Sequence, residues 1–204
     1  TVGINDDVSN LSIPVNEHID TEEKGTIRCK FWGYGSDGTV SANKNSIKII
    51  GEGTDKYVQG YFQYDSNKSG GFTVSHLRFG DKKIQSQYTL TNSEFIALHR
   101  QQYIGKYDIL EGITEGGTFL INCAFKPEDA FSKFTKEMQD TIREKNIKVY
   151  MVDASKLAKK VGLGNRINTI MQTAFFKLSG VLDQDTAIDM SKKFVEKQFI
   201  SKGK

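Results

Sequence analysis

Two glycine-rich segments contain the residues of this 204-residue chain that are best suited to bind a phosphate group. The first is a complete GxGxxG motif at Gly33, Gly35 and Gly38, between a predicted strand and a predicted helix. Glycines there permit a tight turn and close approach of the backbone to a ligand, and free N–H groups at the helix start favour an anion. Asp37 departs from this pattern, because its carboxylate repels phosphate unless it points away or caps the helix. The residues alone support phosphate binding and plain turn formation equally.

The second segment, Lys68-Ser69-Gly70-Gly71, follows the second predicted strand. In a parallel sheet the first two strands are neighbours and their carboxyl ends face one crevice, so this segment could form a second anion cradle. A dinucleotide site needs an acid here for the ribose, and Asp65 is further along the chain than the usual spacing. Lys68 suits a phosphorylated ribose better. The alternative is a glycine-rich hairpin with a solvated lysine.

The other reactive side chains are few. His76 alternates with Arg78 along a predicted strand, and a lone strand histidine is more often structural than catalytic. Cys29 is expected to be buried and inert. Cys123, at a strand end, is only a slightly better candidate for a nucleophilic thiol. Two cysteines without a CxxC motif and three scattered histidines exclude an iron–sulfur cluster, a zinc ribbon or a disulfide scaffold built by this chain alone. We therefore expect no catalytic residue and no metal ligand here.

The composition is that of a globular protein and gives no sign of binding to nucleic acid or of insertion into a membrane. The net charge of +3 does not argue for nucleic acid, and no apolar run is long enough to cross a membrane. Without a signal peptide, the expected location is cytoplasmic. The chain begins at Thr1 without a methionine, which we interpret as an internal segment of a longer protein.

Charge divides the chain into two parts. Residues 1–24 hold six acids and one base, a net charge of −5, and show no helical or alternating period. We interpret 1–24 as an acidic linker or arm and 25–204 as one domain, which is long enough to bury a core.

Strands and helices are predicted to alternate along the domain. The predicted strands are 26–32, 57–64, 72–79, 86–90, 117–122 and 149–152. The predicted helices are 40–50, one beginning at 91–94 and continuing through 98, then 126–145, 155–161, 165–178 and 185–199. This order predicts an α/β fold, a Rossmann-like three-layer domain with a mostly parallel central sheet flanked by helices.

Three blocks of sequence resemble one family. They are Gly33-Tyr34-Gly35-Ser36-Asp37-Gly38-Thr39-Val40-Ser41-Ala42-Asn43-Lys44-Asn45, the stretch from Tyr64 to Gly80 with Lys68-Ser69-Gly70-Gly71 and Ser75-His76-Leu77-Arg78, and Gly162-Leu163-Gly164-Asn165-Arg166-Ile167-Asn168. Together they resemble the gamma-type domain of pyruvate:ferredoxin (flavodoxin) oxidoreductases, which is the third domain of the single-chain enzymes. The resemblance runs from about residue 21 to residue 182.

The resemblance implies an enzyme that converts pyruvate and coenzyme A to acetyl-coenzyme A and CO2, and passes electrons to ferredoxin or flavodoxin. Thiamine diphosphate, Mg²⁺ and the [4Fe–4S] clusters would then lie on other domains or subunits of a homodimeric parent, and this domain alone would be inactive. Because the gamma-type domain is associated with coenzyme A, the resemblance assigns the coenzyme contacts to Gly33, Gly35, Ser36, Gly38, Thr39, Lys44, Lys68, Ser69 and Gly70.

Two other hypotheses stay open at this point. One is a stand-alone NAD(P)-dependent oxidoreductase that uses the GxGxxG motif. The other is a purely structural interface domain, in which the glycines serve only turns and the apolar stripe of residues 167–178 docks neighbours. The pocket chemistry does not distinguish pyruvate from another 2-oxoacid.

Overall fold

A six-stranded sheet forms the centre of the domain. The computed structural model describes residues 2, 8–15, 19–66 and 70–200. The strands are β1 (Ile27–Tyr34), β2 (Tyr57–Tyr64), β3 (Phe72–Gly80), β4 (Ser93–Leu98), β5 (Ile113–Asn122) and β6 (Lys148–Val152), in the spatial order β2-β3-β1-β4-β5-β6. The pairs β1–β4, β4–β5 and β5–β6 are parallel, whereas β3 runs antiparallel to both β1 and β2.

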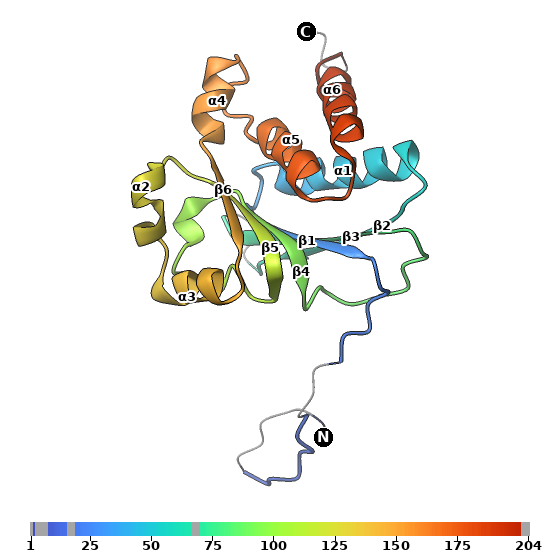
Figure 1. The fold of residues 1–204 in the computed structure, drawn as a ribbon, viewed down its shortest axis with the longest axis vertical. Coiled ribbons are helices and arrows are strands. Elements are labelled where there is room, and N and C mark those ends of the chain that lie inside the picture. The colour runs from blue at the N-terminus through green and yellow to red at the C-terminus, as the bar shows by residue number, and fades with distance from the viewer. Residues whose placement is uncertain (1, 3–7, 16–18, 67–69, 201–204) are drawn as a thin grey trace.

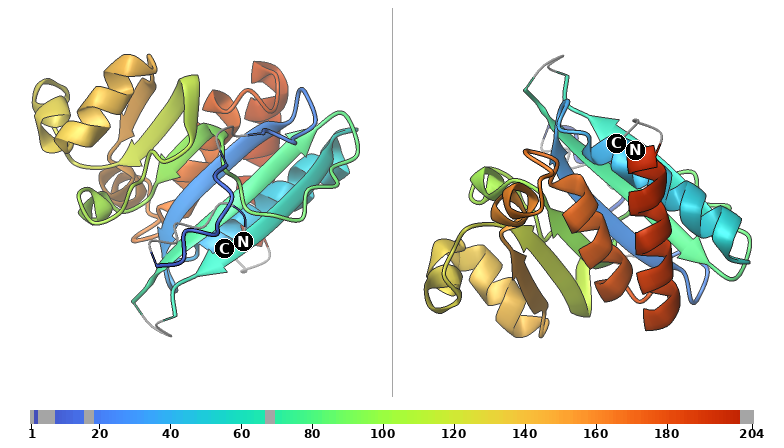
Figure 2. Two further views of the ribbon diagram at one scale, coloured as in Figure 1. Left: turned by 90° about the horizontal axis from the view of Figure 1, so that it is seen from below. Right: turned by 90° about the horizontal axis from the view of Figure 1, so that it is seen from above.

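Helices cover both faces of this sheet (Figures 1 and 2). One face packs against α1 (Thr39–Gly53), α4 (Ala154–Lys160), α5 (Asn168–Leu178) and α6 (Gln184–Ile200). The other face packs against the short helix η1 (Gln101–Tyr103) and α3 (Lys136–Glu144), and α2 (Pro127–Ala130) and η2 (Phe131–Lys133) lead into α3. The predicted α/β class, with a mostly parallel sheet between helical layers, is confirmed.

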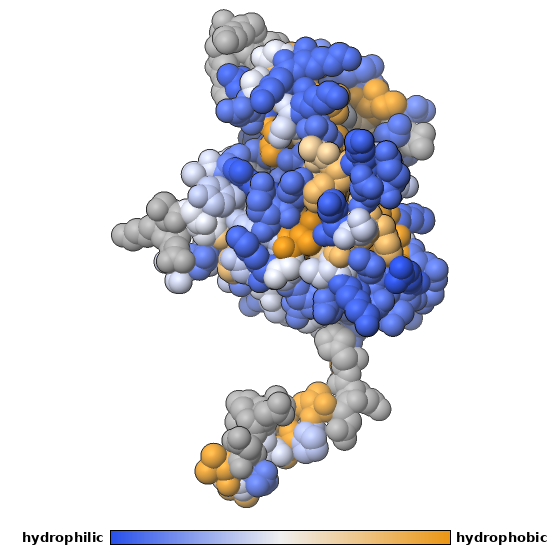
Figure 3. All heavy atoms as spheres, turned by 90° about the vertical axis from the view of Figure 1, so that its left-hand side faces the viewer, coloured by the Kyte–Doolittle hydropathy of each residue, from blue (hydrophilic) through white to orange (hydrophobic). Residues whose placement is uncertain are grey.

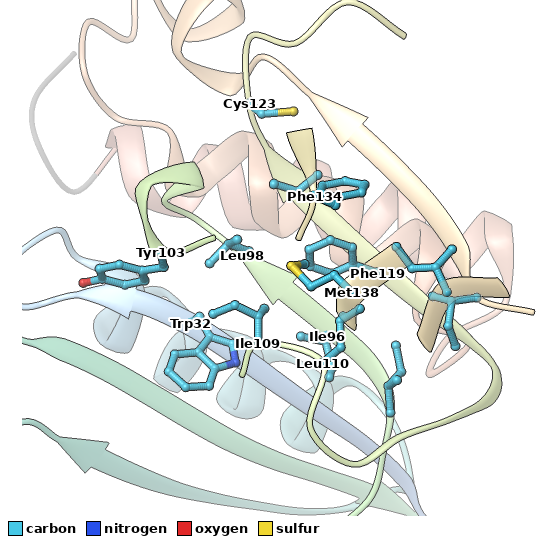
Figure 4. Close-up of a cluster of buried hydrophobic side chains, with 14 of the residues drawn as sticks. Trp32, Ile96, Leu98, Tyr103, Ile109, Leu110, Phe119, Cys123, Phe134 and Met138 are labelled. Carbon is cyan, nitrogen blue, oxygen red and sulfur yellow. The ribbon is translucent and has the colours of Figure 1, made fainter. Parts of the chain in front are cut away.

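Alternation along the strands sends side chains into two separate cores. On β1, Phe31 faces the α1 and α5 side, where Phe175 packs edge-on against it with the ring centroids 5.0 Å apart. Its neighbour Trp32 faces the opposite core. Figure 4 shows that second core, in which strand residues point toward Phe134 and Met138 from the α3 side. Burial of both cores fixes the register of the central strands.

The sequence-based prediction is wrong between residues 86 and 98. Residues 86–90 form no strand, and the predicted helix through Leu98 is the strand β4. Four successive residues of β4, Phe95 to Leu98, are almost completely buried because the strand is central and parallel. Such a strand has no alternation, so its apolar run is indistinguishable from a buried helix by period.

Two predicted helices have different boundaries in the structure. The predicted helix 126–145 is divided by Phe134, whose backbone is extended, and α3 begins after Thr135, whose hydroxyl caps it by accepting the N–H of Met138 at 3.3 Å. Helix α1 continues past the predicted end at residue 50, through two glycines. Gly53 is the last residue of α1, so the helix ends within the glycine-containing segment 51–53, and a Cβ at Gly53 would lie 2.2 Å from the flexible end of the Met190 side chain.

The arm is exposed in one part and bound to the domain in another. Residues 8–15 are mostly exposed, and several of them are apolar, as Figure 3 shows in the segment below the body of the domain. In contrast, Asp20 pairs with Arg28 and Glu22 pairs with Arg78. The predicted boundary between the arm and the domain, between residues 24 and 25, stays a prediction. Both of these ion pairs join residues on its two sides. Within the described residues, no helix has the length and apolar character that crossing a membrane requires.

Candidate functional site

The glycine turn follows β1 and leads directly into α1. Gly33 is still part of β1, and a Cβ there would lie 2.6 Å from the Thr39 side chain, so this glycine lets α1 start close to the strand. Gly38 precedes α1 with a φ of 85°, and Ser36 has a φ of 72°. Both conformations belong to the left-handed region that side chains with a Cβ disfavour. The turn is therefore tight, with Ser36 exposed on it.

Asp37 is used inside the turn. One carboxylate oxygen accepts the N–H of Tyr34 at 2.9 Å, and the other accepts the N–H of Thr39 at 2.8 Å. The carboxylate thus caps α1, one of the two orientations that the sequence left open. It also takes up an N–H that was predicted to be free for a bound anion. The Thr39 side chain is buried against Gly33, and its contact with the coenzyme stays a prediction.

The second glycine segment lies beside the turn, but for a reason other than the one predicted. Strands β1 and β2 are not neighbours, because β3 lies between them and pairs antiparallel with each. The β2–β3 hairpin nevertheless returns at the carboxyl edge of β1, where Gly35 donates its N–H to the carbonyl of Gly71 at 2.8 Å. Gly70, with a φ of 84°, approaches the Tyr34 hydroxyl. Lys68 and Ser69 lie outside the described residues.

The third block, residues 162–168, meets the same turn from the helical layer. Asn168, at the start of α5, donates its side-chain N–H to the carbonyl of Asp37 at 2.7 Å. One turn further, Gln172 donates to the carbonyl of Ala42 and to the hydroxyl of Ser46, and so joins α5 to α1. Three blocks that are far apart in the sequence therefore converge at one edge of the sheet.

Two exposed cations lie near this edge. Lys44, on α1, is exposed, and its Nζ lies 5.2 Å from the centre of the Phe62 ring. Arg100 follows β4, and its guanidinium lies 5.0 Å from the centre of the Tyr34 ring, next to the glycine turn. Sequence reasoning missed Arg100 because residues 91–98 were assigned to a helix. The signal that could have found it is the apolar run of β4 followed at once by two basic-type side chains, His99 and Arg100.

A crevice of about 430 Å³ extends from Arg100 along the carboxyl ends of the parallel strands. Its lining comes from the ends of β4, β5 and β6 and from the approach to α5: residues 99–102, 122–124, 153, 155, 165 and 167. The chain leaves β1 toward one face of the sheet and β4 toward the other. Open α/β sheets bind ligands at such a switch point.

His99 forms part of the crevice wall and carries no charge near neutral pH. Its side chain is almost completely buried, and burial lowers its pKa to about 4. Its Nδ1 has no hydrogen-bond partner among the described residues. Cys123, also in the wall, is a free buried cysteine, and burial raises the pKa of its thiol. Burial raises the thiol pKa of Cys29 as well, so neither cysteine is an activated nucleophile.

Metal ligation finds no support in the described part of the chain. There, no group of three or more histidine, cysteine, aspartate or glutamate side chains is placed to hold a metal ion. The arrangement at the carboxyl edge is instead suited to binding an anion, through exposed cations and a backbone that a ligand can approach closely.

Comparison with known proteins places the chain in a family. A family model described as pyruvate ferredoxin/flavodoxin oxidoreductase matches residues 28–204. The chain belongs to this family.

Curated members of the family are similar over the full chain. The chain is 55% identical over 203 residues to the pyruvate:ferredoxin oxidoreductase of Moorella thermoacetica, and 48% identical over 204 residues to the pyruvate-flavodoxin oxidoreductase of Enterobacter agglomerans. In both cases the match covers 100% of this chain and 17% of the relative. The chain thus spans about a sixth of the length of these oxidoreductases.

Solved structures share the fold at lower identity. The pyruvate oxidoreductase subunit PORC of Thermotoga maritima superposes with a TM-score of 0.66 at 22% identity, covering 86% of each chain. The 2-oxoglutarate:ferredoxin oxidoreductase of Magnetococcus marinus, solved with 2-oxoglutarate, coenzyme A and succinyl-CoA bound, superposes with a TM-score of 0.61 at 16% identity, covering 89% of this chain and 28% of that one. Fold class and family therefore agree.

Proposed function

We propose that this chain is the gamma-type domain of a cytoplasmic pyruvate:ferredoxin (flavodoxin) oxidoreductase, and that the carboxyl edge of its sheet binds coenzyme A. In this proposal the parent enzyme forms acetyl-coenzyme A and CO2 from pyruvate and coenzyme A, and ferredoxin or flavodoxin takes the electrons. Thiamine diphosphate, Mg²⁺ and the iron–sulfur clusters belong to other parts of a homodimeric parent. The isolated chain is then inactive, because the cofactors that carry out the chemistry are elsewhere.

The observation that carries this proposal is the meeting of three sequence blocks at the switch point of the sheet. The bond from Gly35 to Gly71 and the bond from Asn168 to Asp37 bring the turn, the hairpin and the start of α5 together. Arg100 adds a cation beside them. Coenzyme A carries a pyrophosphate and a 3′-phosphate, so it needs more than one cationic contact along one surface.

Within this proposal, we choose the residues that contact the coenzyme by their exposure and by access to their backbone. Ser36, Lys44 and Arg100 are exposed. Gly35 and Gly70 keep the backbone open to approach, and Lys68 and Ser69 are retained on their chemistry and their place in the sequence. Gly33, Gly38 and Thr39 shape the turn from within.

The order of the strands argues against the NAD(P) alternative. In a dinucleotide-binding domain the acid for the ribose follows a strand that lies parallel and next to β1. Here Asp65 follows β2, which is separated from β1 by β3. The neighbouring parallel strand is β4, which is followed by His99 and Arg100 instead of an acid.

Calorimetric titration of the chain with coenzyme A, dephospho-coenzyme A, NAD and NADP tests the proposal. Coenzyme A should bind, and loss of the 3′-phosphate should weaken binding about tenfold, the effect of roughly one charged contact. Lys68→Ala should weaken binding of coenzyme A, whereas Lys148→Ala, at the amino end of β6, should not. Binding of NAD without a coenzyme A signal would contradict the proposal.

Inter-domain contacts form the second part of the proposed role. The described part of the arm exposes apolar side chains, among them Val8 at 90% and Leu11 at 76% exposure. Exposed apolar residues in succession mark surfaces that bind other protein parts. We assign these side chains to contacts with other domains or subunits of the parent oxidoreductase.

A further inference from the structure

Four basic side chains lie in a block on the sheet face opposite α1. Arg28 and Lys30 alternate along β1 toward this face, and Arg78 and His76 lie beside them on β3, paired in register as Arg28 with Arg78 and Lys30 with His76. In the view from below in Figure 2, β1 and β3 face the viewer with no helix over them. All four residues are nevertheless buried, each with 9% exposure or less. Each buried charge among them therefore requires a partner.

The two arginines have carboxylate partners and Lys30 has none among the described residues. Arg28 pairs with Asp20 and Glu94. Arg78 pairs with Glu22. Lys30 is 4% exposed and donates one N–H to the backbone carbonyl of Glu111 at 3.0 Å. Its ammonium has three N–H groups, so two are available for another acceptor. Burial lowers the pKa of Lys30, and the negative charges of Glu111 and Asp108 oppose this shift without cancelling it.

A cavity of about 500 Å³ opens beside Lys30. Trp32 lines it and buries an indole N–H that has no hydrogen-bond partner among the described residues. Gln63 also lines it, and its side-chain oxygen lies 3.4 Å from Nε2 of His76. Nδ1 of that histidine accepts the N–H of Leu90 at 3.2 Å, so Nε2 carries the proton and donates to the Gln63 oxygen. The amide NH2 of Gln63 remains as a further donor.

The rest of the wall sets the kind of acceptor that fits. Phe72, Val74 and Leu90 make part of it apolar, and the hydroxyls of Thr89 and Thr91 can serve as donors or acceptors. Glu111 contributes the one carboxylate of the described lining, and this residue is exposed. A lining that combines hydrogen-bond donors with apolar side chains suits a single negative charge on a small apolar body. A phosphate, with more charge and no apolar part, fits this lining less well.

We propose that this cavity is a binding site for a small monocarboxylate, whose carboxylate pairs with Lys30 and whose apolar part packs against Phe72, Val74 and Leu90. The site is distinct from the proposed coenzyme A edge, since it uses other side chains and lies on the sheet face opposite α1. Its volume lies within the range of small-molecule sites.

Trp32 is the single tryptophan of the chain, so its fluorescence reports on this cavity directly. The probes are butyrate and its neutral isostere butyramide, added to the 204-residue chain. Butyrate should change the fluorescence saturably with a Kd on the order of 1 mM, as expected for so small a ligand. Butyramide should bind at least tenfold more weakly. Equal responses to the two probes, or no saturation by butyrate up to roughly fifty times that Kd, would overturn the proposal.

Two variants and a control locate the effect. Lys30→Met, which replaces the ammonium with an apolar group of similar length, should weaken butyrate binding at least tenfold while thermal unfolding verifies the fold. Gln63→Met changes an exposed residue and should weaken binding several-fold without affecting folding. Lys148→Met, on the exposed end of β6, should bind butyrate as the wild type does. Unchanged binding in both cavity variants, or tighter binding of an acidic dipeptide than of butyrate, would contradict the assignment.

Discussion

The buried pair of Glu22 and Arg78 offers the sharpest test of how the arm is attached. The Arg78 side chain is 1% exposed and that of Glu22 is 7% exposed. Nη2 of Arg78 lies 2.6 Å from Oε1 of Glu22, and Nε of Arg78 donates to the same oxygen at 2.8 Å. Glu22→Gln keeps the shape and removes the negative charge. Removing one partner of a buried pair costs about 3–5 kcal/mol, because the other charge stays buried. Arg78 keeps its bond to Gln59 at 2.9 Å and its contact with the Tyr88 ring, so we expect about 3 kcal/mol.

Urea unfolding of the chain measures this loss. The midpoint should fall with an unchanged slope, and the melting temperature should fall by roughly 6–12 °C for a domain of this size. The matched control is Glu23→Gln, which removes the neighbouring acid from its exposed pair with Lys82 and should leave the midpoint where it is. If Glu22→Gln behaves as Glu23→Gln does, the ion pair does not fasten the arm to the domain and the reasoning is refuted.

Two further predictions concern the turn and the buried histidines. Gly38→Ala should destabilise the chain by about 1–2 kcal/mol, because the backbone of Gly38 is left-handed. The loss should exceed that of Gly164→Ala, since of these two positions only Gly38 would place the new Cβ against Asn168, at 2.9 Å. Equal losses of the two variants in urea unfolding would contradict a role for that contact. Burial lowers the pKa of both His76 and His99 from 6.5 to about 4. The unfolded chain thus binds their protons first, and the free energy of unfolding should decrease as the pH falls from about 6.5 to 4. NMR titration should find both imidazoles neutral at pH 5.5, and midpoints near 6.5 would contradict their burial.

Local patterns in the sequence were sufficient to predict the strand, turn and helix around the glycine motif. The strand, the GxGxxG spacing and the small residues of α1 all act within about thirty residues, and the structure has this unit at Ile27–Gly53. The gross α/β class follows from the same kind of local evidence. The role of Asp37 as a cap was one of two local possibilities, and its two backbone bonds decide it.

Long-range pairing decided what could not be predicted. No local feature of the sequence predicts that β3 lies between β1 and β2, or that the buried strand β4 pairs with β1. The error at β4 also concealed Arg100, since only a strand would carry it to the carboxyl edge. Nothing in the sequence around Lys30 marks it as a buried residue. Its burial depends on the chain segments that cover β1 and β3.

Steady-state kinetics of the parent oxidoreductase with Arg100→Gln test the central claim most directly. The matched control is Arg143→Gln, which loses a similar contact, with the Phe131 ring at 4.7 Å, on α3. The account predicts that Arg100→Gln raises the KM for coenzyme A about tenfold and leaves the KM for pyruvate unchanged, while Arg143→Gln alters neither. A KM for coenzyme A that is the same in both variants and the wild type would contradict coenzyme binding at this edge.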